Sequence, residues 1–228
     1  MSKNEVPLAG GHTTVGVVRV DETTRRPPGP NAGFVRALLR HLELVGFAGA
    51  PRYLGVDEAG REMFSYLAGD VPENLGHHDD ATLKSAGLLI RRYHDATSPL
   101  FDTVSCRETG IEIACHNDLS PCNTVFRDGR PCGLIDFDAA APGPRAYDLG
   151  YAAWLWLDVG NDAYSSAEQC RRLQLFVSAY GCELTDADVV AAMLDRQVIG
   201  IAEAMRTGNQ PMADWVDNSR RWTLRHLR

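Results

Sequence analysis

Two neighbouring stretches decide the fold of this chain: CHNDLSPCNTVF at residues 115–126 and GLIDFD at residues 133–138. An Asp-Gly pair at 128–129 separates their apolar, β-prone runs, and this pattern is typical of a tight β-hairpin. Such a hairpin brings Asn123, which precedes its first strand, beside Asp136, which follows its second strand. The sequence therefore predicts an amide oxygen and a carboxylate at one place.

A third polar side chain, Asp118, lies five residues before Asn123. Transfer of a γ-phosphoryl group needs a carboxylate beside the attacking hydroxyl and oxygen ligands that hold Mg²⁺ against the phosphates. Protein kinases supply these groups from His-Arg-Asp, four residues, Asn, and a later Asp-Phe-Gly. Each of Asp118, Asn123 and Asp136 alone is better explained as a cap or a turn former, but these three and His116, four residues in register, favour a catalytic site.

Residues 116–123 (HNDLSPCN) and 135–138 (IDFD) resemble the motifs of the aminoglycoside phosphotransferase and choline kinase family, the small-molecule relatives of protein kinases. The resemblance covers the whole chain and implies an α+β, bilobal, protein-kinase-like fold. Residues 1–68 are expected to form a small nucleotide-binding lobe with an antiparallel β-sheet and one helix. Residues 69–228 are expected to form a larger, mainly helical lobe with the catalytic loop, the metal site and the substrate pocket.

The resemblance also assigns roles to single residues. Asp118 resembles the catalytic base that orients or deprotonates the substrate hydroxyl, and Asn123 and Asp136 resemble the Mg²⁺ ligands. Ile135 is expected to lie under the adenine, with ATP or GTP as the phosphate donor.

Three further residues resemble supporting groups of this family. His116 resembles the histidine that stabilises the catalytic loop, and Asp148 resembles the buried carboxylate that anchors the backbone of that loop. Asp138 matches a position that is commonly acidic in such enzymes, with a less defined role.

The N-terminal part offers candidate nucleotide contacts. Gly11 lies in a glycine-containing loop before a strand, where backbone N–H groups can approach a phosphate, and Thr13 or Thr14 adds a hydroxyl donor. Two glycines before a strand are, by themselves, more typical of a simple turn. Ser65 and Leu67 are expected at the base of the adenine site, where the chain passes from one lobe to the other.

The sequence departs from the family pattern around the phosphates. Arg25 or Arg26 stands where kinases carry a lysine on the third strand, and an arginine fork can grip phosphate in a bidentate manner. We favour Arg25 for this contact. The glutamate that partners this cation is expected near Phe34 or Val35, neither of which can pair with it, and Glu43 lies too late on the helix.

Hydrophobic periodicity and turn signals predict the remaining elements. Strands are expected at 23–26, 51–56 and 62–67, and helices at 32–43, from Asp79 or Asp80 to near His94, and at 151–157, 167–180, 186–206 and 212–227. Thr185 is expected to cap the helix that starts at 186. The segment Pro142 to Pro144 is expected to break the chain.

Composition and charge narrow the classes of partner and the cellular location that we expect. The chain has 228 residues and a net charge of −7, which argues against nucleic acid as a partner because such binding calls for a basic face. No apolar stretch approaches the ~20 residues that span a bilayer, and the first residues lack the apolar core of a secretory signal. We expect a cytoplasmic protein, a monomer or homodimer, with no membrane partner. The six cysteines include no Cys-x-x-Cys pair and are expected to be free thiols in a cytosolic chain, and their spacing matches no common zinc site.

The leading functional hypothesis is transfer of a phosphoryl group to a free hydroxyl of a small molecule. An antibiotic of aminoglycoside, peptide or nucleoside type is expected as the substrate, with resistance as the outcome. The segment 69–115, which often helps to build the substrate pocket, is short beside typical family members, so the substrate is poorly constrained.

Two alternatives stay open. One is a metabolic kinase for choline, homoserine or a sugar-like compound; a choline site would need an aromatic cage, for which Trp154, Trp156 and Trp215 are candidates. The other is a non-catalytic pseudokinase, against which the complete set of Asp118, Asn123 and Asp136 speaks.

Overall fold

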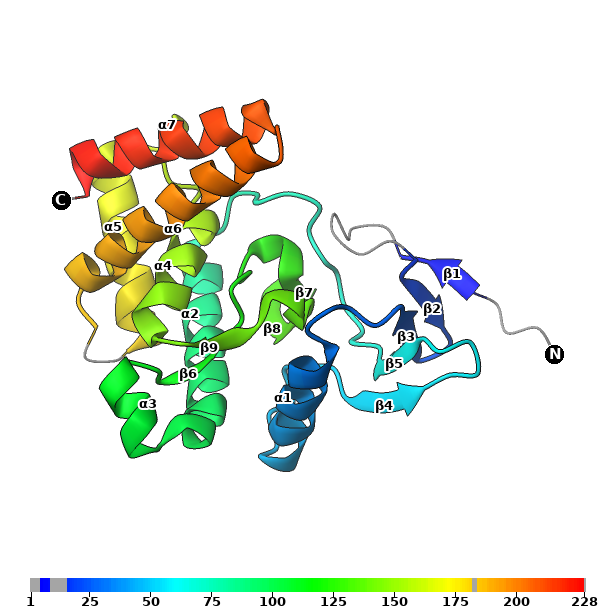
Figure 1. Cartoon of the computed structure of the whole chain (residues 1–228). Coiled ribbons are helices and arrows are strands. Elements are labelled where there is room, and N and C mark those ends of the chain that lie inside the picture. The colour runs from blue at the N-terminus through cyan, green and yellow to red at the C-terminus, as the bar shows by residue number, and fades with distance from the viewer. Residues whose placement is uncertain (1–4, 9–15, 182–183, 228) are drawn as a thin grey trace.

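The computed structural model describes residues 5–8, 16–181 and 184–227. Figure 1 shows a β-sheet at one side of the molecule, a helical part at the other, and the hairpin of β7 (Thr124–Arg127) and β8 (Arg130–Leu134) between them. This arrangement is the α+β fold with a sheet-containing N-terminal part that the sequence predicts. The lobe boundary at residues 68 and 69 stays a proposal.

Within the described residues, the sheet has five antiparallel strands in the order β1-β2-β3-β5-β4. Their bounds are β1 Glu5–Pro7, β2 Val18–Val20, β3 Thr23–Arg26, β4 Tyr53–Val56 and β5 Glu62–Ser65. In the register of β3 and β5, Arg26 lies opposite Glu62 and Arg25 lies opposite Met63. Successive side chains of a strand point to opposite faces, so the two arginines leave β3 on different sides of the sheet.

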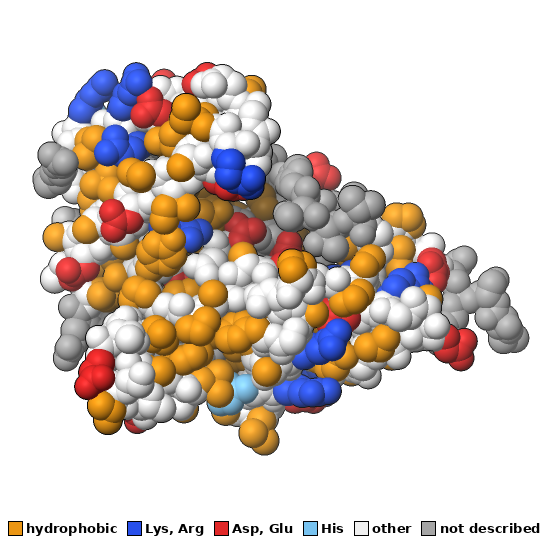
Figure 2. All heavy atoms as spheres, viewed as in Figure 1, with side chains coloured by type: hydrophobic (Ala, Val, Ile, Leu, Met, Phe, Trp, Pro, Cys, Tyr) orange, Lys and Arg blue, Asp and Glu red, His pale blue; other side chains and the backbone are white. Residues whose placement is uncertain are grey.

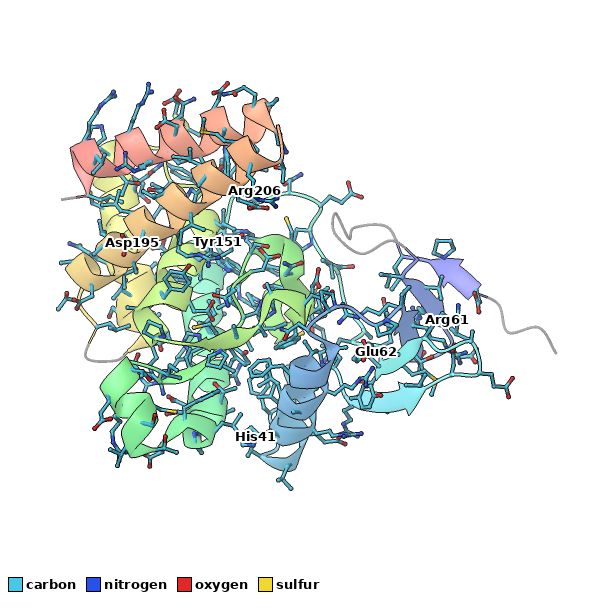
Figure 3. All side chains as sticks on the ribbon, in the orientation of Figure 1. His41, Arg61, Glu62, Tyr151, Asp195 and Arg206 are labelled. Carbon is cyan, nitrogen blue, oxygen red and sulfur yellow. The ribbon has the colours of Figure 1, made fainter. Side chains whose placement is uncertain are left out.

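Helix α1 (Ala32–Leu44) follows the Pro-rich loop after β3 and ends one residue beyond its predicted end. Its buried face carries Val35, Leu38, Leu39 and Leu42 at helical spacing. His41 of the same helix contacts the carbonyl of Ala96 with its Nε2 atom, at 2.8 Å, and so links α1 to the helical part. Figure 3 labels His41 at this position.

Six helices follow in the described residues of the C-terminal part. They are α2 Asp80–Thr97, α3 Val104–Thr109, α4 Arg145–Trp156, α5 Ser166–Tyr180, α6 Asp186–Arg206 and α7 Gln210–His226. The caps explain where they begin. Asp79 accepts from the N–H of Thr82, and Thr185 forms a reciprocal capping box with Asp188. Both predicted caps are confirmed, whereas the short α3 was not predicted.

The helical part is organised by pairwise packing. Helix α2 packs against α5, α4 against α6, and α6 against α7. Their buried faces share one apolar core, which also includes residues of α1 and the hairpin. Among the described residues, no helix is both long and apolar enough to cross a bilayer.

The predicted hairpin is confirmed, including its turn. Asp128 and Gly129 both have positive φ angles, +51° and +71°, as a tight two-residue turn between twisted strands requires. The expected break at 142–144 is wrong. Residues Ala141–Gly143 form β9, which pairs with β6 (Ile113–Cys115). Pro142 is tolerated because, among the described residues, this ladder has two strands and β9 is an edge strand, where a residue can lack an N–H donor.

A close backbone contact joins the sheet part to the hairpin. Asp70 and Phe126 exchange two backbone hydrogen bonds, at 2.9 and 2.7 Å. Gly69 precedes this contact with φ of +151°, and a Cβ atom there would lie 2.3 Å from the carbonyl oxygen of Phe126. Only glycine fits this position, which explains why the chain carries one where it leaves the sheet.

Candidate active site

The carboxylate of Asp118 is held from two sides. Asn123 Nδ2 donates to Asp118 Oδ2 at 2.7 Å, and the hydroxyl of Tyr151 donates to Asp118 Oδ1 at 2.8 Å. Burial, together with the neighbouring Asp118 charge, raises the pKa of Tyr151 far above its ordinary value. The phenol therefore stays protonated and acts as a permanent donor, which fixes the direction in which the Asp118 carboxylate points.

The loop that carries Asp118 is fastened to a fully buried carboxylate on α4. The oxygens of Asp148 accept the backbone N–H groups of His116 and Asn117, each at 2.8 Å. Burial acts to raise the pKa of Asp148, but hydrogen bonds from His94 and the loop outweigh it, and the pKa is lowered. The carboxylate stays ionised and holds the loop, including Asn117 with its positive φ of +65°.

A buried histidine completes this anchor. His94 of α2 lies with Nε2 3.0 Å from Asp148 Oδ2 and Nδ1 2.8 Å from the hydroxyl of Tyr180. Burial lowers the pKa of His94, so the ring is neutral. The neutral ring then donates from Nε2 to Asp148 and accepts from Tyr180 at Nδ1.

The ring of His116 ties the same loop to the hairpin. Its Nε2 atom donates to the carbonyl of Ile135 at 3.0 Å, and the ring packs against Phe137 with centroids 4.6 Å apart. This geometry agrees with a role for His116 in supporting the loop rather than in the chemical step.

Asn123 and Asp136 meet where the two strands of the hairpin reach the loop. The N–H of Ile135 donates to the carbonyl of Asn123 at 3.0 Å, which brings Asp136 alongside. The amide nitrogen of Asn123 is occupied by Asp118, while no described residue donates to its Oδ1 atom. Burial, with the nearby Asp138 charge, raises the pKa of Asp136 and outweighs the opposing effect of the Arg26 guanidinium.

These oxygens fit a hard cation. Mg²⁺ is typically held by one or two protein carboxylates together with water and phosphate oxygens rather than by a complete protein cage. Within the described part of the chain, no group of three or more His, Cys, Asp or Glu side chains is arranged to hold a metal. A cation at Asn123 and Asp136 would therefore need oxygen ligands from outside the protein.

Arg26, not Arg25, reaches these carboxylates. Its guanidinium lies 3.6 Å from Asp136 Oδ1 and forms a close ion pair with Asp138. Arg25 points to the opposite face of the sheet and pairs with Asp57 at 3.4 Å. The strand alternation argues against the preference for Arg25 that the sequence suggested.

The first helix offers no glutamate near Phe34 and Val35 that could pair with an arginine of β3, and it carries a base there instead. Helix α1 carries Arg36, whose Nε atom lies 2.6 Å from Oε1 of Glu62 on β5. Glu62 is only 1% exposed and lies opposite Arg26 in the strand register. Glu43 instead pairs with Arg52 at the surface, at 3.5 Å. The acid thus comes from the strand and the base from the helix.

The residues expected at the adenine site, Ser65, Leu67 and Ile135, differ in how they lie in the structure. Ser65 already exchanges hydrogen bonds with Arg52: its N–H donates to the Arg52 carbonyl, and its Oγ accepts the Arg52 N–H. Its expected contact with adenine is therefore not supported. No described residue bonds the backbone groups of Leu67, and Ile135 is half-buried beside Asn123. The expected phosphate contacts Gly11, Thr13 and Thr14 lie outside the described residues.

Sequence reasoning missed Tyr151, although a signal was present. Asp148 was assigned to the loop anchor, and Tyr151 lies three residues later on the same helix, hence on the same face. The signals for Glu62 and His94 were weaker, because the residues that they contact lie far from them along the chain.

Comparison with known proteins agrees with this geometry. The sequence pattern of the phosphotransferase enzyme family matches residues 107–192, which include the loop, the hairpin and α4. The trifolitoxin immunity protein of Rhizobium leguminosarum bv. trifolii is 32% identical over 196 residues, which cover 78% of this chain and 74% of that protein.

Solved structures share the fold at low sequence identity. A choline/ethanolamine kinase family protein from Mesorhizobium loti superposes with a TM-score of 0.66 at 18% identity, covering 99% of this chain and 88% of that one. The GDP complex of aminoglycoside 2'-phosphotransferase-IIIa superposes with a TM-score of 0.58 at 17% identity, covering 99% and 92%.

The fold and the family pattern together define a small-molecule phosphotransferase with a protein-kinase-like fold. The chain belongs to the phosphotransferase enzyme family.

Proposed function

We propose that this protein transfers the γ-phosphoryl group of ATP or GTP to a hydroxyl of an antibiotic or toxin and thereby protects the cell that makes it. The observation that carries the proposal is the fixed carboxylate of Asp118 beside Asn123, Asp136 and Arg26. The protective role is supported by the name of its relative, an immunity protein.

Asp118 orients the acceptor and takes its proton. Asn123 and Tyr151 each occupy one lone pair of the carboxylate, and an acceptor hydroxyl can donate to another. The acceptor oxygen then forms a bond to the γ-phosphorus while the bond from that phosphorus to the β,γ-bridging oxygen breaks. The proton of the hydroxyl passes to Asp118 as the new bond forms.

Asn123 Oδ1 and Asp136 would hold Mg²⁺. When bound, the cation neutralises charge on the phosphate oxygens and fixes their position. Arg26 stands beside the same carboxylates and can present its fork to a phosphate once Asp136 engages a cation. The proposed adenine contacts are the free backbone groups of Leu67 and the side chain of Ile135, and Gly11, Thr13 and Thr14 remain proposed phosphate contacts.

The alternative of a choline kinase depends on an aromatic cage, for which Trp154, Trp156 and Trp215 are the candidates. Trp154 and Trp156 are 3% and 2% exposed, and Trp154 stacks on Trp215 with centroids 5.2 Å apart. Two of the three rings are therefore buried and only Trp215 is exposed, at 37%, so the structure does not favour a quaternary ammonium acceptor. No observation favours homoserine or a sugar-like acceptor over an antibiotic.

The test is phosphate transfer from γ-labelled ATP and GTP to a panel of antibiotics and central metabolites, read as a mass increase of one phosphate. Asp118→Ala serves as the inactive control. Transfer to an antibiotic by the native protein alone supports the proposal. Transfer only to a central metabolite would overturn the protective role, and no transfer to any acceptor would favour the pseudokinase.

A further inference from the structure

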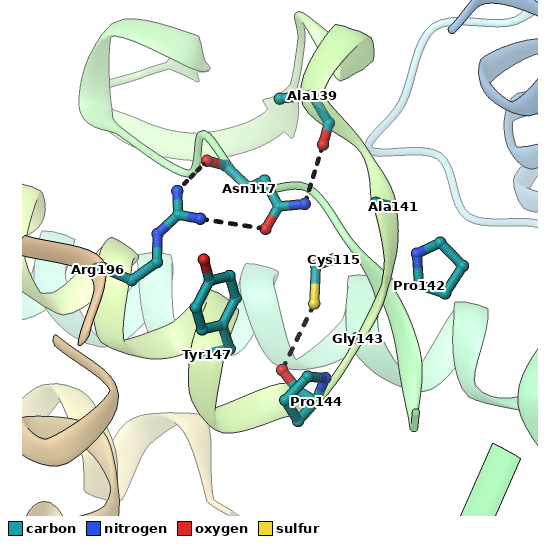
Figure 4. A pocket seen from close by; sticks show the side chains of 9 residues that line it. All are labelled: Cys115, Asn117, Ala139, Ala141, Pro142, Gly143, Pro144, Tyr147 and Arg196. Carbon is teal, nitrogen blue, oxygen red and sulfur yellow. Dashed lines mark hydrogen bonds between the residues drawn. The ribbon is translucent and has the colours of Figure 1, made fainter. Parts of the chain in front are cut away.

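A pocket of about 530 Å³ opens beside the catalytic loop (Figure 4). Residues of β6, the loop, β9, α4 and α6 contribute to its wall: Cys115, Asn117, Ala139, Ala141, Pro142, Gly143, Pro144, Tyr147 and Arg196. Among these described residues Arg196 alone carries a charge. The proposed phosphate transfer makes no use of it.

Arg196 is held in place without a carboxylate. One guanidinium nitrogen donates to the Asn117 carbonyl at 2.7 Å, and another lies 3.5 Å from Asn117 Oδ1. The guanidinium also lies over the rings of Tyr147 and Tyr151, 4.6 and 4.3 Å from their centroids. Its Nε atom is buried with no hydrogen-bond partner in the described structure. Its positive charge is therefore not neutralised by an ion pair with a described side chain.

The position of Arg196 connects the pocket to the candidate base. Arg196 bonds Asn117, whose next residue is Asp118, and it covers Tyr151, which donates to the Asp118 carboxylate. Asp118 does not itself line the pocket, but the side chain of Tyr151 contacts both its carboxylate and the guanidinium, so the pocket lies next to the candidate base.

The other walls are largely apolar. Alanine and proline side chains of residues 139–144 and the ring of Tyr147 form them, and Figure 2 shows apolar side chains gathered on the face that carries β9. Figure 4 shows the Tyr147 hydroxyl on the same side as Arg196 and Asn117, and no described residue bonds it. A preformed cation, a free hydroxyl and apolar walls suit an anionic ligand with an apolar body.

We propose that this pocket is the acceptor subsite and that it selects a hydroxyl compound carrying a carboxylate on an apolar or aromatic body. The inference rests on the proposed phosphate transfer, whose acceptor it specifies. A polycationic acceptor is disfavoured, because it would place like charge beside Arg196 without a carboxylate on the described pocket wall.

The experiment uses three matched probes: para-(hydroxymethyl)benzoate, its amide and the corresponding benzylamine. They share a ring and a primary alcohol and differ in the para substituent, which is negative, neutral or positive. Their binding to the nucleotide-free protein is measured by calorimetric titration, which needs no turnover. We expect the carboxylate to bind at least about tenfold more tightly than the amine, as a charge-assisted hydrogen bond implies.

Variants distinguish two possible roles of Arg196: binding of the ligand, and support of the loop that carries Asp118, here called loop bracing. Arg196→Gln should abolish the preference for the carboxylate. Tyr147→Phe keeps the ring under Arg196 and should weaken carboxylate binding severalfold while leaving amine binding unchanged. Arg206→Gln alters an exposed arginine of the same helix that pairs with Glu203, and should bind all probes like the native protein.

A second arm keeps this inference distinct from the proposed function. Phosphate transfer from labelled ATP and GTP to the same probes is followed by mass. A carboxylate preference without transfer supports the subsite and counts against the phosphotransfer. Equal or absent binding of the carboxylate overturns the inference, even if another acceptor is phosphorylated. Loss of transfer in Arg196→Gln with the carboxylate preference intact would assign Arg196 to loop bracing alone.

Discussion

Tyr151 donates a 2.8 Å hydrogen bond to Asp118 from a position one helical turn beyond Asp148, whose carboxylate holds the backbone of the same loop. One face of α4 therefore helps to set both the path of the loop that carries Asp118 and the direction of its carboxylate. The candidate base is positioned by a helix as well as by Asn123 of its own loop, and the helix links it to the rigid helical core.

Removing this hydroxyl should slow the chemical step. We expect Tyr151→Phe to lower kcat about tenfold, the size expected when a hydrogen bond to a charged acceptor is lost. The Michaelis constant for the nucleotide should not change, because Tyr151 lies on the acceptor side. Tyr164→Phe, which removes a hydroxyl that contacts His77 at the surface, is the matched control. A raised nucleotide Michaelis constant with native kcat would contradict this role.

The two arginines of β3 should differ in their effect on nucleotide binding. Arg26→Met keeps packing on Phe64, over which the guanidinium lies at 5.0 Å, and should weaken nucleotide affinity about tenfold by removing a charge-assisted contact. Arg25→Met should leave nucleotide affinity unchanged, because its partner Asp57 lies on the other face. Titration of both variants with nucleotide and Mg²⁺ measures this. The opposite order would return the phosphate contact to Arg25.

The buried carboxylate of Glu62 should matter for stability. Glu62→Gln removes the charge that pairs with the partly exposed Arg36, and we expect a loss of about 1–3 kcal/mol in the free energy of unfolding. Glu43→Gln breaks an exposed pair with Arg52 and should cost no more than about 1 kcal/mol. Urea denaturation of both variants gives the comparison. Equal losses would show that burial of Glu62 contributes nothing.

Acid should destabilise the protein through His94. Its pKa is lowered from the ordinary 6.5 by burial, so the unfolded chain binds a proton at a higher pH than the folded one. The associated stability is complete above about pH 6.5 and is lost as pH falls toward the folded pKa, with a slope of up to about 1.4 kcal/mol per pH unit. Asp148, also lowered, adds a loss only below its ordinary value of 3.8.

Denaturation curves between pH 5 and 8, roughly the range in which histidine titrates, test this expectation. His94→Gln should be less stable at the upper end but should lose less stability on acidification. His226→Gln, at an exposed position near the end of α7, should follow the native curve. A native slope retained in His94→Gln would assign the acid sensitivity to other groups.

Local patterns predicted much of the fold. The Asp-Gly turn of the hairpin, the cap at Asp79 and the cap at Thr185 each depend on a few adjacent residues, and all three are confirmed. The strand at Ala141–Gly143 was missed because Pro142 is normally a strand breaker, and its pairing with β6 is a long-range contact.

The sequence alone predicted those residues of the candidate site that lie in one segment of the chain. Asp118, Asn123 and Asp136 lie within nineteen residues of each other, counted along the printed sequence, and the hairpin brings Asn123 and Asp136 together beside the loop that carries Asp118. Arg26 needed the strand register, and Arg196 lies 79 residues after Asn117, to which it bonds. Pairings of that kind depend on how helices pack, which periodicity does not reveal.

The most direct test of the central claim is calorimetric titration of nucleotide with and without Mg²⁺. The account predicts that the native protein binds in a Mg²⁺-dependent manner, that Asp136→Asn loses this dependence, and that Asp118→Asn retains it while transferring no phosphate. Mg²⁺-dependent binding that survives in Asp136→Asn, or phosphate transfer that survives in Asp118→Asn, would contradict it.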